Sequence, residues 1–342
     1  MVLLELEGLE VGYSEGNETI TAVDGIDLSV DANETLGIVG ESGCGKSTVI
    51  KSIIGILDDN GRILDGTITF KGDDIAGYSP EELNERVRWQ EISYVPQNAM
   101  AALDPVYRLG AQIVEVIREH TDQSKGQARD RAEELLAQVG LDADRMYDYP
   151  HELSGGQRQR GVIALALALE PSLILADEPT TGLDVVIQDE ILGLLDRIQR
   201  DLDCGVVLVT HDMSVVAEVA DKTAVMYGGR VMEVGTTSDV FTHSAHPYTI
   251  GLKNAFPKLS RDGDRSRLIS IPGAPPDLRD PPTGCRFTAR CPFATEECGA
   301  EEPPTEELGD SQRAKCHYTE RSGEFRRRGE SAALWLEEGE DA

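Results

Sequence analysis

The residues Gly40-Glu41-Ser42-Gly43-Cys44-Gly45-Lys46-Ser47 fit the pattern G-x-x-x-x-G-K-(S/T) of a phosphate-binding loop. Thr35–Val39 before them predicts a buried strand, and Thr48–Ile54 after them predicts a helix. A glycine-rich turn lets backbone N–H groups approach the phosphates of a nucleotide, and the helix N-terminus adds a favourable dipole. Lys46 supplies a point charge, and the Ser47 hydroxyl can bind Mg²⁺. A glycine-rich turn without a ligand is the alternative, but the flanking strand and helix favour a nucleotide site.

The charge of the chain is strongly acidic. Its 342 residues, enough for two domains, carry 62 acidic against 32 basic side chains and a net charge of −30. Such self-repulsion is tolerable where salt screens it, because the Debye length shrinks to about 3 Å at 1 M salt. We therefore expect the cytoplasm of a halophile. An acidic surface for a basic partner would need a block of like charge, which the even spread of acids does not supply, and the same charge argues against nucleic-acid binding.

No hydrophobic run in the sequence reaches the length of a membrane span. The best run, Gly161–Leu169, is stopped by Glu170-Pro171 and suits a buried helix. The N-terminal residues are acidic at every second step from Glu5 and lack the features of a signal peptide. We therefore expect a protein on the cytoplasmic side of the membrane.

Several predicted strands end in side chains suited to phosphate, metal or proton chemistry. Open α/β sheets place their ligands at the carboxyl ends of the strands, where such side chains meet. The side chains are Gln97, Asp177, Glu178 and His211, at the ends of the predicted strands Ile92–Gln97, Leu173–Glu178 and Val206–Thr210. We expect them to lie close to the phosphate-binding loop. A core histidine is the less favoured alternative for His211.

A second anion-ready helix N-terminus follows a helical insert. The insert predicts two helices between Leu109 and Gly140, and Ser154-Gly155-Gly156 then precedes a helix that is expected to run to Glu170, with Ser154 as its N-cap. Tyr13 lies in a predicted turn near the end of the first strand. It either stacks on adenine or packs as an ordinary tyrosine, and the sequence does not decide between these.

With these motifs in place, residues 2–245 resemble an ATP-binding-cassette (ABC) ATPase. Leu153-Ser154-Gly155-Gly156-Gln157 matches the signature motif of that family, and the match continues through Thr181–Asp184 and His211. The resemblance implies an α/β P-loop fold: a RecA-like core, an antiparallel β subdomain and a helical subdomain at about 98–160, within a domain at 1–245. It also implies ATP and Mg²⁺ as ligands.

The resemblance also assigns roles to particular residues. Lys46 and Ser47 would hold the phosphates and Mg²⁺, Asp177 would hold Mg²⁺ through water, and Gln97 would sense the metal and the attacking water. Glu178 would deprotonate that water, and His211 would contact the γ-phosphate. Ser154, Gly155 and Gly156, with Gln157, would cap the ATP of a partner subunit, and Asp184 would couple the two sites. The remaining expected nucleotide contacts are Tyr13, Gly40, Glu41, Ser42, Gly43, Cys44, Gly45 and Thr48.

Further motifs resemble the ATPases of oligopeptide/dipeptide importers. They are Tyr149–Glu152, Asn98–Pro105, His246–Tyr248, Pro272–Pro276 and Cys285–Phe293. The resemblance implies a second ATPase subunit in a heterodimer, two transmembrane permeases and an extracytoplasmic solute-binding protein, with this chain peripheral at the cytoplasmic face of the membrane. Import of nickel or sugars by the same machinery, and a soluble ABC ATPase outside transport, are the alternatives.

Residues 246–342 predict a loop-rich tail with four clustered cysteines. Cys285, Cys291, Cys298 and Cys316 have the spacing C-x5-C-x6-C-x17-C, unlike a zinc ribbon, and a reducing compartment argues against disulfides. Four thiolates can hold a 4Fe–4S cluster, as tails of this kind in the resembled family do. Zinc, with His317 in place of one thiolate, and free thiols are the alternatives. We expect ATP binding to be largely independent of the tail, because the phosphate-binding loop rests on its own sheet.

Overall fold

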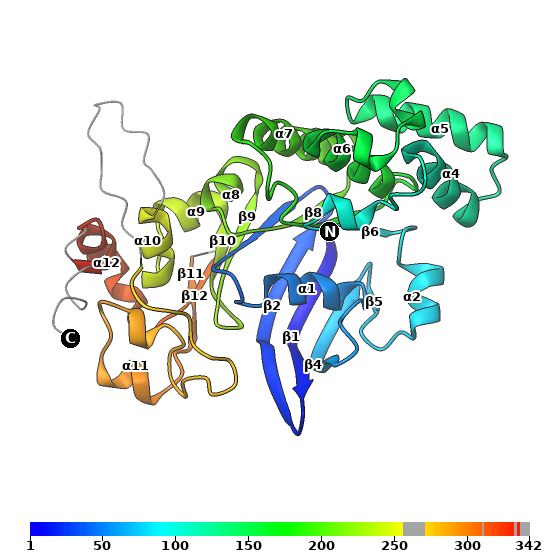
Figure 1. Cartoon of the computed structure of the whole chain (residues 1–342). Coiled ribbons are helices and arrows are strands. Elements are labelled where there is room, and N and C mark those ends of the chain that lie inside the picture. The colour runs from blue at the N-terminus through cyan, green and yellow to red at the C-terminus, as the bar shows by residue number, and fades with distance from the viewer. Residues whose placement is uncertain (256–270, 310, 332–333, 336–342) are drawn as a thin grey trace, which may run out of the picture.

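A computed structural model describes residues 1–255, 271–309, 311–331 and 334–335 (Figure 1). The strands of the larger sheet are β3 (Thr35–Val39), β6 (Ile92–Val95), β7 (Leu173–Asp177), β8 (Gly205–Thr210), β9 (Lys222–Tyr227), β10 (Arg230–Thr236), β11 (Thr305–Leu308) and β12 (Gln312–Lys315). They lie in the order β11-β12-β10-β9-β3-β8-β7-β6. The pairs among β3, β6, β7, β8 and β9 are parallel. Every residue of β3, β7 and β8 is buried, as expected where both faces of a parallel sheet are covered.

A smaller antiparallel sheet covers one side of the nucleotide loop, as the sequence predicts. It contains β1 (Val2–Glu15), β2 (Glu18–Asp31), β4 (Gly61–Phe70) and β5 (Asp73–Asp74), in the order β2-β1-β4-β5. Helix α1 (Lys46–Ile53) packs with both sheets in one apolar cluster, to which it contributes Val49, Ile50 and Ile53. The phosphate-binding loop is therefore wedged between two sheets.

The helical region lies at the opposite end of Figure 1 from the C-terminal tail. Its helices are α3 (Ala99–Ala102), α4 (Leu109–His120), α5 (Lys125–Gln138), η1 (Ala143–Tyr147), η2 (Pro150–Glu152) and α6 (Gly155–Ala166). Outside this region, α2 (Pro80–Arg86) packs through Leu83 into the apolar cluster of the two sheets, and α7 (Val185–Leu202) and α8 (Met213–Val219) follow later in the chain. The two predicted helices at 109–140 are confirmed. The prediction that α6 continues to Glu170 is wrong: it ends at Ala166, and Glu170 before Pro171 has a left-handed backbone with φ 53°. A residue before proline is disfavoured in the helical region, so the turn precedes it.

The tail extends the main sheet. After α9 (Thr237–Thr242), the elements of the tail are α10 (Pro247–Asn254), η3 (Thr288–Arg290), α11 (Glu296–Ala300), η4 (Thr319–Arg321) and α12 (Ser322–Gly329), together with β11 and β12. β12 pairs with β10, and β11 pairs with β12 as the last strand of the sheet. Tyr248, Phe287 and Phe325 share an apolar cluster with Val39, the last residue of the strand that leads into the phosphate-binding loop. The tail is thus joined to the nucleotide-binding part by both a sheet and a core.

Candidate nucleotide-binding site

The phosphate-binding loop adopts a shape that requires glycine at its two ends. A Cβ at Gly40 would lie 2.1 Å from the Met226 carbonyl oxygen, and Gly45 has φ 103° with the Ala22 carbonyl oxygen 2.5 Å from where its Cβ would be. Lys46 is buried at 5% exposure. Its Nζ donates to the carbonyl oxygens of Gly40 at 2.8 Å and Glu41 at 2.9 Å, so the ammonium group is held inside the loop.

Ser47 and Asp177 meet at the end of the loop, as predicted. The Ser47 hydroxyl donates to Asp177 Oδ1 at 3.0 Å, and the Tyr94 hydroxyl donates to Asp177 Oδ2 at 3.3 Å. Burial raises the pKa of Asp177, while the hydrogen bonds from Ser47 and Tyr94 oppose that rise. A hydroxyl and a buried carboxylate at this spacing are the oxygen ligands that suit Mg²⁺ beside a phosphate.

Glu178 is the meeting point of three polar side chains. Its Oε2 lies 3.0 Å from Gln97 Nε2, 2.8 Å from Thr181 Oγ1 and 3.2 Å from His211 Nδ1. The residue has a left-handed backbone with φ 46°, and its N–H donates to the Val209 carbonyl oxygen of β8 at 2.9 Å. The backbone hydrogen bond and the three side-chain contacts therefore fix the position of the Glu178 carboxylate at the end of β7. A carboxylate held in this way can orient a water molecule.

The signature residues form the N-terminus of α6. Ser154 is its N-cap, as predicted: Ser154 Oγ accepts from the Gln157 N–H at 3.3 Å and the Gln157 side chain accepts from the Ser154 N–H at 2.9 Å. A Cβ at Gly156 would lie 2.6 Å from Ile187 Cγ2, so only glycine fits against α7. Asp184 caps α7 by accepting from the Ile187 N–H at 3.1 Å. In the described part of the chain, no hydrogen bond links Ser154, Gly155, Gly156 or Asp184 to the phosphate-binding loop.

Tyr13 lies beside the loop, but in a different setting from the predicted turn. It is inside β1, paired with Ile20 of β2 and Gly61 of β4. β1 does not end at Gly12: the register of its pairing with β2 shifts between Val11 and Gly12, and the strand continues. The Tyr13 hydroxyl lies 3.3 Å from Thr48 Oγ1, in the first turn of α1.

Three residues at this site have no counterpart in the sequence-based assignment: Tyr94, Tyr248 and Arg290. The Glu41 N–H donates to the Tyr248 hydroxyl at 3.0 Å. Arg290 of the tail forms a two-pronged ion pair with Glu41, with Nη1 2.7 Å from Oε2 and Nη2 2.9 Å from Oε1. The expectation that the loop rests on its own sheet alone is therefore incomplete, because its second residue is also held by the tail.

The four clustered cysteines of the tail line one small pocket. His246, Phe287, Phe293, His317 and Phe325 line it with them. Burial raises the pKa of Cys285 and Cys291, and it raises that of Cys316 to about 12. Backbone N–H groups of Phe287, Phe293 and Tyr318, each two residues further along, hydrogen-bond to these thiols and oppose the rise. Within the described residues, no group of three or more His, Cys, Asp or Glu is arranged to hold a metal ion.

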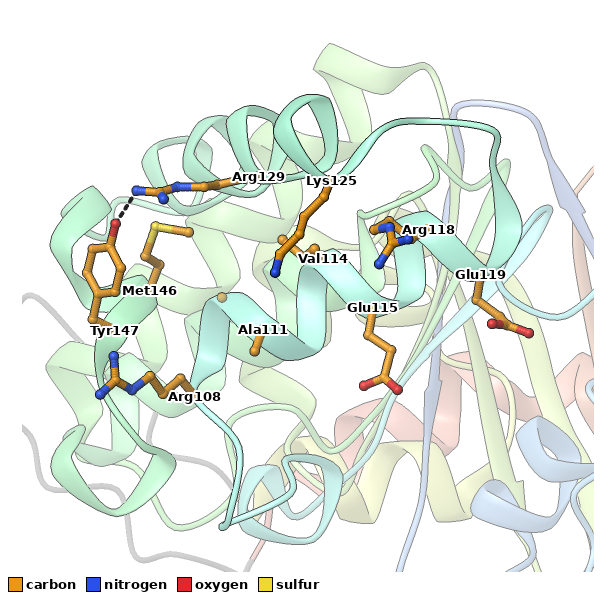
Figure 2. Close-up of a pocket in the computed structure, with 11 residues that line it drawn as sticks. Arg108, Ala111, Val114, Glu115, Arg118, Glu119, Lys125, Arg129, Met146 and Tyr147 are labelled. Atoms are coloured by element: carbon orange, nitrogen blue, oxygen red, sulfur yellow. Dashed lines mark hydrogen bonds between the residues drawn. The ribbon is translucent and has the colours of Figure 1, made fainter.

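A separate hollow of about 570 Å³ lies on the helical region, between α4, α5 and η1 (Figure 2). Arg108, Arg118, Lys125 and Arg129 line it together with Glu115 and Glu119. The Arg129 guanidinium is turned toward the Tyr147 hydroxyl (Figure 2). None of the predicted nucleotide contacts lines this hollow, so it is distinct from the phosphate-binding loop.

Family models match two parts of the chain. A model described as ABC transporter matches residues 23–181, and one described as Oligopeptide/dipeptide transporter, C-terminal region, matches residues 232–298. The second match includes Cys285, Cys291, Cys298 and Arg290.

Curated relatives match over nearly the whole chain. The dipeptide transport ATP-binding protein DppD of Escherichia coli (strain K12) is 43% identical over 93% of this chain and 97% of its own length. The oligopeptide transport ATP-binding protein OppD of the same organism is 44% identical over 92% of each chain.

A solved ATP-binding cassette, MJ0796, in a dimeric post-hydrolysis state bound to ADP and Pi, superposes with a TM-score of 0.62 at 30% identity. The match covers 69% of this chain and 99% of that one. Sequence and fold agree: the chain belongs to the ABC transporter ATPases of the oligopeptide/dipeptide importer type.

Proposed function

We propose that this chain hydrolyses ATP to power the uptake of dipeptides or oligopeptides across the cytoplasmic membrane. The observation that carries the proposal is the convergence of Ser47, Asp177 and the Glu178 cluster on one end of the phosphate-binding loop. The substrate class follows the printed names of relatives that match over nine tenths of the chain. Import of nickel or sugars would use the same machinery and is decided by the uptake test below.

Each residue of the site would have a distinct role in ATP binding or hydrolysis. Lys46 and the backbone of residues 40–48 would bind the phosphates, and Ser47, with Asp177 acting through water, would hold a Mg²⁺ ion that neutralises phosphate charge. Glu178 orients the attacking water and accepts its proton, with Gln97 and His211 placed on the same carboxylate oxygen to position the water and the γ-phosphate. Tyr13 would lie beside the adenine.

The signature residues would complete the ATP site of a second subunit. Ser154 and Gly155 lie at the partly exposed start of α6, and Val185 and Val186 beside Asp184 are 79% and 68% exposed. A helix N-terminus supplies N–H donors to an anion, and the exposed valines offer apolar surface for a second cassette. The dimeric state of MJ0796 supports this arrangement. We propose a heterodimer with a related ATPase subunit.

We propose two permeases and a solute-binding protein as the other subunits, with this chain at the cytoplasmic face. Across the described ranges, no helix has the length and apolarity to cross a membrane.

Peptide uptake by intact cells tests the proposed function. A strain that lacks this chain should fail to accumulate a labelled dipeptide and oligopeptide. The wild-type gene should restore uptake and Lys46→Ala should not. Intact peptide uptake with lost nickel or sugar uptake would overturn the substrate class, and membrane association that persists without the permeases would favour an ATPase outside transport.

We propose that the four tail cysteines hold a 4Fe–4S cluster. The supporting observation is that the four cysteines line one pocket together with apolar side chains. Burial raises the pKa of three of the thiols, and a cluster would offset this because its irons stabilise thiolates. As the described residues stand, no three of them are arranged around a metal, so cluster binding would draw the cysteines together. Protein purified without oxygen should contain about four irons and absorb broadly near 400 nm. One zinc and no iron would instead support the zinc alternative, and neither metal would leave free thiols.

We propose that the net charge of −30 adapts the chain to high salt. The acidic side chains are screened when the Debye length falls from about 10 Å at 0.1 M to about 3 Å at 1 M salt. The unfolding midpoint should therefore rise with KCl across this range. A midpoint that is flat or falls would contradict the proposal.

A further inference from the structure

The loop between the first two clustered cysteines reaches the nucleotide site. Arg290, which directly precedes Cys291, is 8% exposed. Besides the two contacts with Glu41, its Nη1 donates to the Tyr227 hydroxyl at 3.1 Å, its Nε to the Pro272 carbonyl oxygen at 2.8 Å and its Nη2 to the Ile271 carbonyl oxygen at 3.2 Å. Every nitrogen of the guanidinium therefore donates a hydrogen bond. The contacts with Tyr227, Ile271 and Pro272 fix the orientation in which the guanidinium pairs with Glu41.

Glu41 is in turn central to the shape of the phosphate-binding loop. Its carbonyl oxygen accepts from Lys46 Nζ at 2.9 Å, its N–H donates to Tyr248, and its side chain is held by Arg290. One residue therefore connects the cation that would bind phosphate with two residues of the tail. A shift of Glu41 would move the carbonyl group that orients Lys46.

A second arginine of the same cysteine loop braces the other side. Arg286, 6% exposed, forms an ion pair with Asp24 of β2. The Asp24 N–H donates to the Gly229 carbonyl oxygen at 2.9 Å, and the Gly229 N–H donates to the Cys44 carbonyl oxygen at 3.1 Å. The Cys285–Cys291 loop thus contacts the phosphate-binding loop directly through Arg290 and indirectly through the β9–β10 turn.

We propose that Arg290 is a positioning residue for ATP binding, and that through it the fold of the cysteine-containing tail sets the affinity of this site for ATP. The bidentate grip on Glu41 holds the phosphate-binding loop in the conformation that presents Lys46. Because binding couplings are reciprocal, ATP in turn stabilises the Cys285–Cys291 loop. The proposal rests on the nucleotide site alone and does not depend on which solute is carried.

The test compares Arg290 with a matched arginine elsewhere on the tail. Arg279 also joins the tail to the cassette, with Nε and Nη2 3.1 and 2.8 Å from Glu15 Oε2, but that pair is exposed. ATP affinity of the full chain would be measured for Arg290→Gln, Arg290→Lys and Arg279→Gln. We expect affinity to fall by about 5- to 150-fold in Arg290→Gln, less in Arg290→Lys, and within twofold of wild type in Arg279→Gln.

Two further readouts separate positioning from general loss of fold. With the partner subunit present, Arg290→Gln should raise KM for ATP while kcat at saturation stays near wild type. The double variant Arg290→Gln/Glu41→Gln should bind ATP no more weakly than the weaker of the two single variants, because each substitution removes the same ion pair. ATP should also slow amide hydrogen exchange at 285–291 in the wild type and less so in Arg290→Gln.

Wild-type ATP affinity in Arg290→Gln would overturn the proposal, as would additive losses in the double variant. If Arg290→Gln does not fold, Glu41→Gln carries the same test, since it removes the ion pair from the side of the cassette. Unchanged affinity in that variant, with exchange at 285–291 unaffected by ATP, would show that the pair only joins the tail to the cassette.

Discussion

Replacing Glu178 with glutamine should separate ATP binding from ATP hydrolysis. The amide oxygen of glutamine can still accept from Thr181 Oγ1 or Gln97 Nε2, which lie 2.8 and 3.0 Å from Oε2, so the local fold should persist. Weakening hydrogen bonds to a charged acceptor costs about 1.5–3 kcal/mol at most. Loss of the general base should lower turnover by about 10²–10⁴, because the amide cannot accept the proton of the water. ATP affinity should stay within about threefold, since Lys46, Ser47 and Asp177 are untouched.

The assay is ATP turnover by the variant paired with a subunit whose own site is inactive, together with ATP binding by the variant alone. His211→Ala in the same pairing is a useful comparison, because His211 contacts Glu178 Oε2 at 3.2 Å without being the base. Turnover of Glu178→Gln near the wild-type rate would refute the assignment of Glu178 as the base. A matching loss of ATP affinity would instead mean that Glu178 shapes the phosphate cradle.

The metal requirement, the acid stability and the dependence on a partner subunit should each respond to a specific change. Tyr94→Phe removes a hydrogen bond that favours the ionised form of Asp177. The Mg²⁺ concentration for half-maximal activity should therefore rise by about fivefold, and by more at low pH, where protons compete for the carboxylate. An increase of the same size at pH 6 and at pH 8 would contradict this. Burial lowers the pKa of His246 from 6.5 to about 3, so its contribution to stability is present above pH 6.5 and is lost as pH falls toward 3, by about 1.4 kcal/mol per unit. His246→Asn, which can still cap α10, should flatten that part of the unfolding profile, and an unchanged slope would show that other groups cause it. Finally, the isolated chain should hydrolyse ATP about 10²–10³-fold more slowly than the chain with its partner ATPase; full activity in a strictly monomeric sample would rule out a shared site.

Those parts of the site that depend only on local sequence patterns and on the order of the strands could be predicted from the sequence. Asp177 and Glu178 could be placed beside the phosphate-binding loop because the carboxyl ends of parallel strands share one edge. Ser154 could be identified as an N-cap because a serine directly precedes a predicted helix, and the structure adds the capping box with Gln157. These inferences need only the order of strands and the spacing within a few residues.

The contacts of the tail could not be found in this way. Arg290 lies 249 positions from Glu41, and Tyr248 lies 207 positions from it, so no local pattern links them. β12 is short, and its sequence Gln-Arg-Ala-Lys lacks the apolar–polar alternation that would indicate a strand, so its place beside β10 could not be predicted. The glycine before Tyr13 favours a turn in the sequence, whereas in the structure β1 continues through Gly12, which lies close to Thr19 and Leu64.

The most direct test of the transport assignment is ATP turnover by the complete complex in membrane vesicles, with and without its solute-binding protein and a peptide. We expect low basal turnover that rises when the peptide-loaded binding protein is added, and no rise when the complex carries Lys46→Ala. Turnover that is already maximal without the binding protein, or that responds to a sugar or nickel and ignores peptides, would contradict it.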